Sequence, residues 1–216
     1  DEGGVALAIG GPYQLVPFVS QGCEPVGEAW TVTATERNTI LTISNRPALD
    51  VLRSSVATLP EREWEGAHSN LVVGFAVDEY RDAFHRGDFI IRGLLAIDPE
   101  AKTLTVGGMP RVGQTIQFHV RDARTADVDL HQMLVEARAH AATGSPVAGL
   151  LCTCVGRGIK LFGTSNHDPA AVRAAFGTLP VAGAYCRGEI GPLGDRTVLH
   201  GFTATFGLLM HEAPPG

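Results

Sequence analysis

The chain has 216 residues, of which 44% are hydrophobic and 19% are charged, as is usual for one large or two small globular domains. A core of this size needs neither a metal nor disulfides to fold. The net charge of −6, from 17 basic and 23 acidic residues, argues against nucleic-acid binding through phosphates and against attachment to anionic lipid.

Two stretches without Asp, Glu, Lys or Arg, residues 3–23 and 139–156, are long enough to raise the question of a membrane span. Gly and Pro residues interrupt both stretches, so we predict no transmembrane helix. Residue 1 is Asp and no signal-peptide pattern follows it, so we expect an N-terminal part to be missing from this sequence. Four cysteines are too few for a disulfide framework, which predicts a reducing cytoplasm. The Arg-rich and Ala-rich composition suggests a bacterial origin.

The first half of the chain is predicted to be mostly strand. Short apolar or alternating runs bounded by turn residues indicate strands over residues 5–9, 14–19, 29–35, 39–43, 71–77, 89–97, 103–106 and 115–120. One helix is expected over residues 48–57, with Asn45 as its cap and Pro47 in its first turn.

The second half of the chain contains the one long helix, predicted from Thr125 to about Ala142. Strands are expected over residues 147–153, 181–186 and 199–209, and a short helix from Asn166 or Asp168 to about Phe176. Some ten strands and about three helices predict an α+β fold. Its sheets should be mainly antiparallel or mixed, because most connections are too short for helical crossovers.

Two glycine-rich segments follow predicted strands and carry the residues best suited to bind a ligand. The first segment contains Cys154, Arg157 and Gly158, and the second contains Gly188 and Glu189. Glycine lets backbone N–H groups approach an anion, an arginine can clamp a carboxylate, and a glutamate can accept an ammonium group. This combination predicts a site for a small zwitterion such as an amino acid. The alternative is that the glycines form ordinary turns and that the Arg–Glu pair is structural.

Arg121 and Asp122 form a further candidate pair just before the long helix. They suit ligand contact, but we favour a structural explanation, in which they form a salt bridge at a strand end and place a negative charge near a helix N-terminus.

The common catalytic and metal-binding patterns are missing. No phosphate loop, dinucleotide fingerprint or Gly-x-Ser-x-Gly elbow occurs, and the spacing of Cys152 and Cys154 is poor for zinc. We therefore expect no cofactor, no metal and no catalysis. An alternative is a cysteine enzyme in which Cys23 or Cys154 is the nucleophile, with His200 or His167 as the base of Cys23.

With these residues in view, the chain resembles the C-terminal half of the FIST family, a family of sensory domains in bacterial signal transduction. The resemblance extends over residues 19–209. It rests on the order and spacing of motifs at residues 19–27, 45–49, 87–92, 113–123, 154–163, 167–168, 180–183, 188–192 and 199–203. It implies that residues 1–20 end an N-terminal FIST half, that residues 21–210 form the C-terminal domain, and that residues 211–216 are a tail.

The resemblance also implies that the chain senses a small ligand, with amino acids as the proposed class, and passes the signal to a partner protein. The family brings no catalytic activity with it. Its motif residues in this sequence are Gly22, Cys23, Arg92, Arg121, Asp122, Cys154, Arg157, Glu189 and His200, and the ligand roles given above to some of them are our inference. The alternative function is a protein-interaction scaffold without a ligand pocket.

Overall fold

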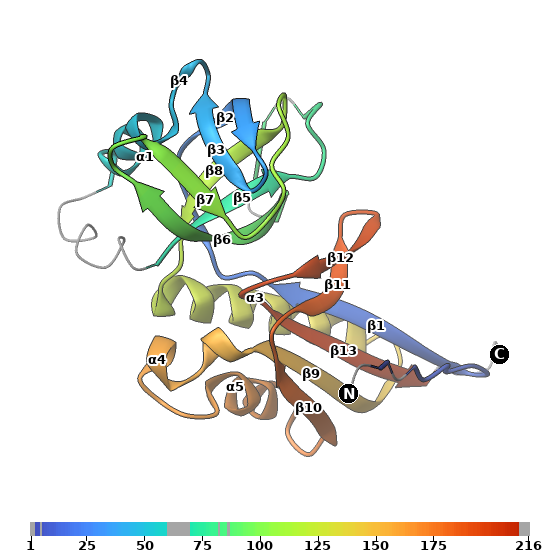
Figure 1. Cartoon of the computed structure of the whole chain (residues 1–216). Coiled ribbons are helices and arrows are strands. Elements are labelled where there is room, and N and C mark those ends of the chain that lie inside the picture. The colour runs from blue at the N-terminus through green and yellow to red at the C-terminus, as the bar shows by residue number, and fades with distance from the viewer. Residues whose placement is uncertain (1–2, 5, 60–69, 82, 86, 212–216) are drawn as a thin grey trace.

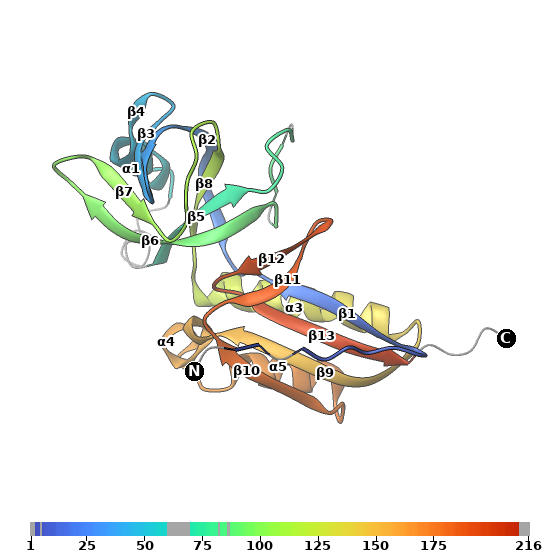
Figure 2. The same ribbon diagram turned by 45° about the vertical axis from the view of Figure 1, so that its right-hand side comes forward.

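The computed structural model describes residues 3–4, 6–59, 70–81, 83–85 and 87–211, and these form the expected α+β fold with antiparallel and mixed sheets. Figure 1 shows two parts, a β-barrel and an open sheet with helices packed on it. The open sheet has four strands. The view in Figure 2 shows the same two parts, with a β-hairpin between them. The first strand belongs to the sheet, and the chain then builds the barrel before returning to complete the sheet.

Six strands in the spatial order β2–β8–β5–β6–β7–β3 form the barrel, and pairing of β2 with β3 closes it. The strands are β2 (Glu24–Glu36), β3 (Thr39–Ile43), β5 (Leu71–Ala76), β6 (Phe89–Asp98), β7 (Thr103–Val106) and β8 (Thr115–Val120). The short strand β4 (Arg46–Pro47) adds to the edge of β3.

A bend in β2 allows one strand to pair on both sides of the barrel closure. Its first part pairs with β8 and its last part pairs with β3, with a shift of register between Val26 and Trp30. Gly27 lies at this shift with φ 66°, a backbone conformation that glycine adopts without strain. A Cβ atom at this position would lie 3.0 Å from the Cβ atom of Ser55, so glycine also lets the neighbouring helix pack closely.

That helix, α1 (Ala48–Val56), packs against the barrel core through one apolar face that includes Leu49 and Leu52. The helix confirms the prediction for residues 48–57. Its predicted cap is wrong, because Pro47 occupies the N-cap position and no side chain caps the helix. Asn45 lies instead in the turn that precedes β4, with φ 59°.

The second part of the molecule is a sheet in the order β1–β13–β9–β10. Its strands are β1 (Tyr13–Ser20), β9 (Ser145–Cys154), β10 (Val181–Cys186) and β13 (Ala204–His211). The strands β9 and β10 run parallel, because the chain between them crosses over through η1 (Val155–Arg157), α4 (Ile159–Phe162) and α5 (His167–Phe176). The other pairings in this sheet are antiparallel.

Two helices cover one face of this sheet, α5 and the long α3 (Ala123–Ala141). Leu130 and Leu134 of α3 and Val172 of α5 pack in one core with Phe206 and Leu208 of β13. The long helix confirms the prediction and begins two residues earlier than expected. The opposite face of the sheet contacts the hairpin of β11 (Glu189–Leu193) and β12 (Arg196–His200).

Two expected strands differ in the structure. Residues 6–9 form no strand, and residue 5 lies outside the described residues. This segment pairs with no strand of the described residues, and Leu7 is 83% exposed, so it lacks the hydrogen bonds and the burial that stabilise a strand. The single strand expected over residues 199–209 is divided into β12 and β13, because Phe202 adopts φ 66° between them.

Among the described residues, no helix is both long enough and apolar enough to cross a membrane.

Candidate functional site

A buried ion pair joins Arg157 of η1 to Asp168 of α5 in the sheet part. Nε of Arg157 donates a hydrogen bond to Oδ2 of Asp168 at 2.7 Å, and Nη2 donates to Oδ1 at 3.1 Å. Both residues are only 1% exposed. Arg157 therefore already binds a carboxylate in the way we predicted it would bind a ligand, and the carboxylate belongs to the protein.

His167 extends this ion pair toward the surface. Its Nδ1 lies 3.0 Å from Oδ1 of Asp168 and its Nε2 lies 2.9 Å from Oδ1 of Asp127, on α3. The imidazole also stacks on the ring of Phe162 with 3.6 Å between the ring centroids. The same phenylalanine ring lies 5.4 Å from the Arg157 guanidinium. The network thus ties η1, α4, α5 and α3 together.

One guanidinium nitrogen of Arg157 has no hydrogen-bond partner among the described residues. This atom, Nη1, is buried and forms no hydrogen bond. It lies beside Gly22, where a Cβ atom would come within 3.0 Å of it and within 2.7 Å of the Ala126 Cα atom. The backbone N–H of Gly22 is held by Oδ2 of Asp129 at 3.0 Å. The turn between β1 and β2 therefore packs directly against the Arg157 side chain.

Arg121 lies at the end of β8, on the path from the barrel to α3. Its Nη2 donates to the carbonyl oxygen of Gly156, and its guanidinium lies 5.3 Å from the ring of Phe202. Burial lowers the pKa of Arg121, whereas the nearby thiols of Cys23 and Cys154 act to raise it. The structure therefore brings together four of the predicted residues, Arg121, Cys23, Cys154 and Arg157. Nε of Arg121 is buried and forms no hydrogen bond.

Glu189 is buried at the start of β11 and binds Thr203, with no ion pair to Arg157. Its Oε2 accepts hydrogen bonds from Oγ1 of Thr203 at 2.8 Å and from the Thr203 backbone N–H at 3.4 Å. Its Oε1 has no hydrogen-bond partner. Burial raises the pKa of Glu189, and the hydrogen bonds from Thr203 and the charges of Arg157 and Arg121 act in the opposite direction. The predicted Arg157–Glu189 pair is thus close enough to interact electrostatically but is not joined.

We call Arg121, Arg157 and Glu189 the polar centre. Each of these buried side chains has one polar atom without a hydrogen bond: Nε of Arg121, Nη1 of Arg157 and Oε1 of Glu189. Buried polar atoms are almost always paired in folded proteins, because an unpaired one costs about 1–3 kcal/mol. The charges of the three residues act on one another, and water or a ligand can supply the partners that the described residues do not.

Asp122, Gly158 and Gly188 lie at the ends of helices and strands. Asp122 caps α3 by accepting hydrogen bonds from the backbone N–H of Thr125 at 2.8 Å and from its Oγ1 at 3.0 Å. Gly158 is the N-cap of α4 and Gly188 precedes β11. This places Asp122 in the helix-terminus role that the sequence left open.

His200 and Arg92 lie where the hairpin meets the barrel, apart from the ion-pair network. Nε2 of His200 lies 3.3 Å from the Gly191 carbonyl oxygen and 3.2 Å from that of Pro192. Burial lowers the pKa of His200. Arg92 of β6 donates to the carbonyl oxygen of Leu199 on β12 at 3.1 Å and so joins the two parts.

The cysteines are thiols, and no disulfide joins them in the described part of the chain. Cys152 of β9 and Cys186 of β10 lie near each other, and burial together with the Cys152 thiol raises the pKa of Cys186. The sulfur of Cys154 accepts a hydrogen bond from the Gly156 backbone N–H at 3.4 Å. Within the described ranges, no group of three or more His, Cys, Asp or Glu side chains is placed to hold a metal ion.

The sequence did not reveal a groove of about 470 Å³ between α5 and β10. Its lining comprises Leu151, Thr153, Pro169, Arg173, residues 177–179 and residues 181–185. The sequence held one indication of this groove, the spacing of four residues between Pro169, Arg173 and Gly177. Residues spaced in this way share one face of a helix. Asp168 and His167 were also missed as partners of Arg157, since the sequence offered Asp168 only as a helix cap.

Comparison with known proteins identifies two family models in this chain. The FIST N domain matches residues 1–46 and the FIST C domain matches residues 48–192. The sequence motifs indicated the C-terminal half of the family, whereas the matches include the N domain as well. The N-terminal match also runs beyond residues 1–20, and the domain boundary expected there remains a prediction.

Curated relatives occur in mycobacteria. An uncharacterized protein of Mycobacterium tuberculosis (strain H37Rv) is 43% identical over 195 residues, which are 90% of this chain and 51% of the relative. An uncharacterized protein of Mycobacterium bovis is 41% identical over 197 residues, which are 91% of this chain and 51% of that relative. The chain thus spans about half the length of the curated relatives it matches. FIST domains are associated with sensory signal transduction. On these matches, the chain belongs to the FIST family.

Proposed function

We propose that this chain is a small-molecule-binding sensory domain of bacterial signal transduction, and that the polar centre binds an amino acid without catalysis. In this proposal the domain works in the cytoplasm and passes the signal to a partner protein. The observation that carries the proposal is the set of three unpaired polar atoms in the polar centre.

The chemistry of these three atoms matches a zwitterion. Nε of Arg121 and Nη1 of Arg157 are N–H donors suited to a carboxylate, and Oε1 of Glu189 is an acceptor suited to an ammonium group. A bound amino acid would also pair three groups that otherwise cost free energy while buried. The ligand carboxylate would share Arg157 with Asp168, which occupies the other two nitrogen atoms of the guanidinium.

Access to the polar centre requires a movement of the protein. Arg157 and Glu189 are each 1% exposed, and the β11–β12 hairpin that carries Glu189 packs between the barrel and the sheet. We propose that the hairpin opens to admit the ligand and closes over it. Such a movement would change the contact that Arg92 makes between β6 and the hairpin. Ligand binding would in this way alter the surface that the partner protein recognises.

A thermal-shift screen of the amino acids tests this function. A ligand at 100 times its Kd adds about 2.7 kcal/mol of stability, which in a chain of this size corresponds to about 5–10 °C in Tm. We expect the shift to disappear in Glu189→Gln and to persist in the exposed control Arg53→Ala. If no amino acid shifts the Tm, or if Glu189→Gln shifts as the wild type does, water pairs the polar centre and the proposed amino-acid site is wrong.

A second candidate function, an interaction scaffold, is favoured by apolar side chains on the sheet face opposite α3 and α5. Leu15 of β1 is 45% exposed and Leu150 of β9 is 46% exposed. Contiguous apolar patches of this kind mark protein contacts more often than chance. The charged variants Leu15→Glu and Leu150→Glu should abolish partner binding if this face is the contact, and should leave amino-acid binding unchanged.

A further inference from the structure

The groove between α5 and β10 lies outside the polar centre and arises from the parallel β9–α5–β10 unit. The strand β10 is the edge of the sheet, and no strand of the described residues pairs with its far side. The helix α5 forms one wall of the groove, β10 forms the other, and Leu151 and Thr153 of β9 lie between them.

Small residues line both walls of the groove, among them Ala182 and Ala184 of β10. Gly183 between them allows β10 to approach β9 closely, because a Cβ atom there would overlap the carbonyl oxygen of its pairing partner Leu151. On the other wall, Pro169 and Arg173 lie one turn apart on α5, and Gly177 follows the helix as its C-cap. The volume of about 470 Å³ lies within the range of small-molecule sites in proteins.

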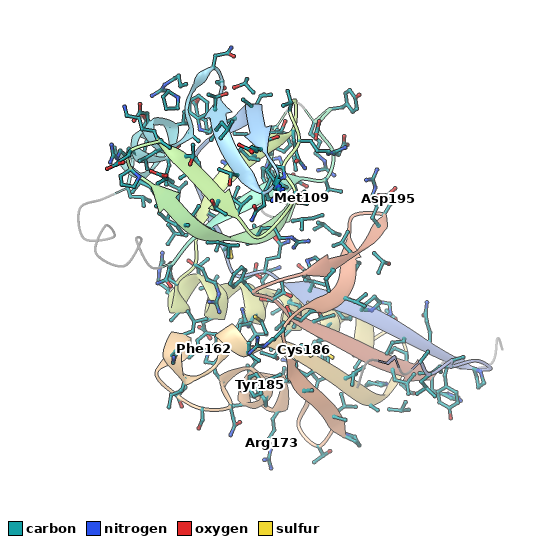
Figure 3. All side chains as sticks on the ribbon, in the orientation of Figure 1. Met109, Phe162, Arg173, Tyr185, Cys186 and Asp195 are labelled. Carbon is teal, nitrogen blue, oxygen red and sulfur yellow. The ribbon has the colours of Figure 1, made fainter. Side chains whose placement is uncertain are left out.

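The groove offers two polar groups within an apolar lining. The Thr153 hydroxyl is buried, with the residue 3% exposed, and its Oγ1 forms no hydrogen bond. Arg173 lies on the α5 wall with its side chain exposed. Figure 3 shows Tyr185 beside α5, and Arg173 pointing from α5 into solvent. The rest of the lining is largely apolar, including Leu151, Leu179 and Val181.

We infer that this groove binds a small monocarboxylate with an apolar or aromatic body. The body would lie against Leu151 and Val181, and a deeper polar atom of the ligand would pair with Thr153. The exposed side chain of Arg173 would turn from solvent toward the rim of the groove to pair with the carboxylate. This site is separate from the proposed amino-acid site and goes beyond it. The same residue types do not fit a zwitterion, because no acidic side chain lines the groove.

The groove shares a helix with the ion-pair network. Pro169, which lines the groove, follows Asp168, which holds Arg157. A ligand that moves α5 would therefore change the position of the Asp168 carboxylate as well. Through this shared helix, a ligand in the groove would influence the polar centre.

Isothermal titration calorimetry with phenylacetate tests the inference, with phenylacetamide as the neutral probe. We expect saturable binding of phenylacetate and at least tenfold weaker binding of the amide. The variant Arg173→Gln should weaken phenylacetate binding about tenfold, whereas Arg53→Gln, an exposed arginine on α1, should not change it. Thr153→Val keeps the side-chain shape and removes the hydroxyl. It should therefore weaken the binding of 4-hydroxyphenylacetate, whose hydroxyl would pair with Thr153.

A variant of the polar centre tests whether the groove binds its ligand independently. Glu189→Gln should leave phenylacetate binding unchanged, so the groove and the amino-acid site can fail independently. Circular dichroism and the Tm of each variant establish that it is folded. No heat with phenylacetate, equal binding in Arg173→Gln and wild type, or equal loss in Arg53→Gln and Arg173→Gln would overturn the inference.

Discussion

Arg157 and Asp168 form two hydrogen bonds with each other inside the protein, and these join the end of β9 to the first turn of α5. Both charges are desolvated, so each depends on the other for its compensation. This relationship decides what Arg157 can do, because only Nη1 is left to meet a ligand.

Replacing Asp168 should therefore destabilise the fold strongly. Asp168→Asn leaves the guanidinium buried without a counter-charge, which costs about 3–5 kcal/mol. Urea unfolding followed by circular dichroism measures this loss, and Asp195→Asn, at an exposed position, should change stability by less than about 0.5 kcal/mol. The double variant Arg157→Met/Asp168→Asn should lose less than the sum of its two single variants. A loss below 1 kcal/mol in Asp168→Asn would contradict the assigned ion pair.

Gly22→Ala should be much more damaging than Gly163→Ala, although both glycines have positive φ. The angles are 64° and 69°, so both variants carry a backbone strain of about 1–2 kcal/mol. A Cβ atom at Gly163 meets nothing within 4 Å, whereas at Gly22 it meets the Ala126 backbone. The overlap should cost a further 1–3 kcal/mol, roughly. Equal losses of stability in urea would show that the turn does not pack on α3 as described.

The stability of the protein should carry a pH dependence due to Glu189. Burial raises its pKa above the ordinary value of 4.5, so folding favours the protonated form. The stability from Glu189 is thus fully present below pH 4.5 and is lost as the pH rises through the folded pKa. Urea unfolding from pH 4 to pH 8 should show the wild type losing stability relative to Glu189→Gln. A constant difference between the two proteins would mean that Glu189 is not perturbed.

His200 should give the stability a pH dependence of the opposite sign to that of Glu189. Burial lowers its pKa below 6.5, so folding favours the neutral imidazole. The stability due to the neutral ring is present above pH 6.5 and is lost as the pH falls toward the folded pKa. Between pH 7.5 and pH 5, the wild type should therefore lose stability relative to His200→Gln. If the two proteins respond alike to acid, this prediction fails.

Thiol labelling separates the sensor from the cysteine-enzyme alternative. Cys186 has a raised pKa, so at pH 7.5 iodoacetamide should label it more slowly than an ordinary thiol with a pKa of about 8.5. Cys23 and Cys154 are buried and should react only after unfolding. Peptide mass spectrometry over time measures each site. Rapid labelling of Cys23 or Cys154 in the folded protein at pH 6.5 would favour a catalytic thiol.

The sequence predicted local structure well where the pattern repeats. The apolar spacing that predicts α3 and the alternation in β2 and β3 both match the structure, because each reports burial of one face. The hairpin was missed since Glu189 and Pro192 lie in a segment dominated by Gly, Arg and Pro, which reads as a loop. Its pairing depends on the surrounding sheet and barrel.

The sequence proposed the residues of the candidate site, which stay a prediction, but not their contacts. Arg157 and Glu189 were proposed because they lie in glycine-rich segments after strands, and Arg121 because it precedes the long helix together with Asp122. The sequence could not show that α5 returns Asp168 to Arg157, since that contact is set by the crossover after β9. The groove was missed for the same reason, because its walls are far apart until β10 pairs with β9.

The pairing of β1 with β13 has a consequence for synthesis on the ribosome. These strands come from opposite ends of the described chain, and every barrel strand lies between them in sequence. The barrel can therefore assemble while β13 is still unmade, whereas the sheet must wait for the last strand to emerge. A contact this distant in sequence closes slowly, so translation should yield a folded barrel tethered to an unfinished sheet.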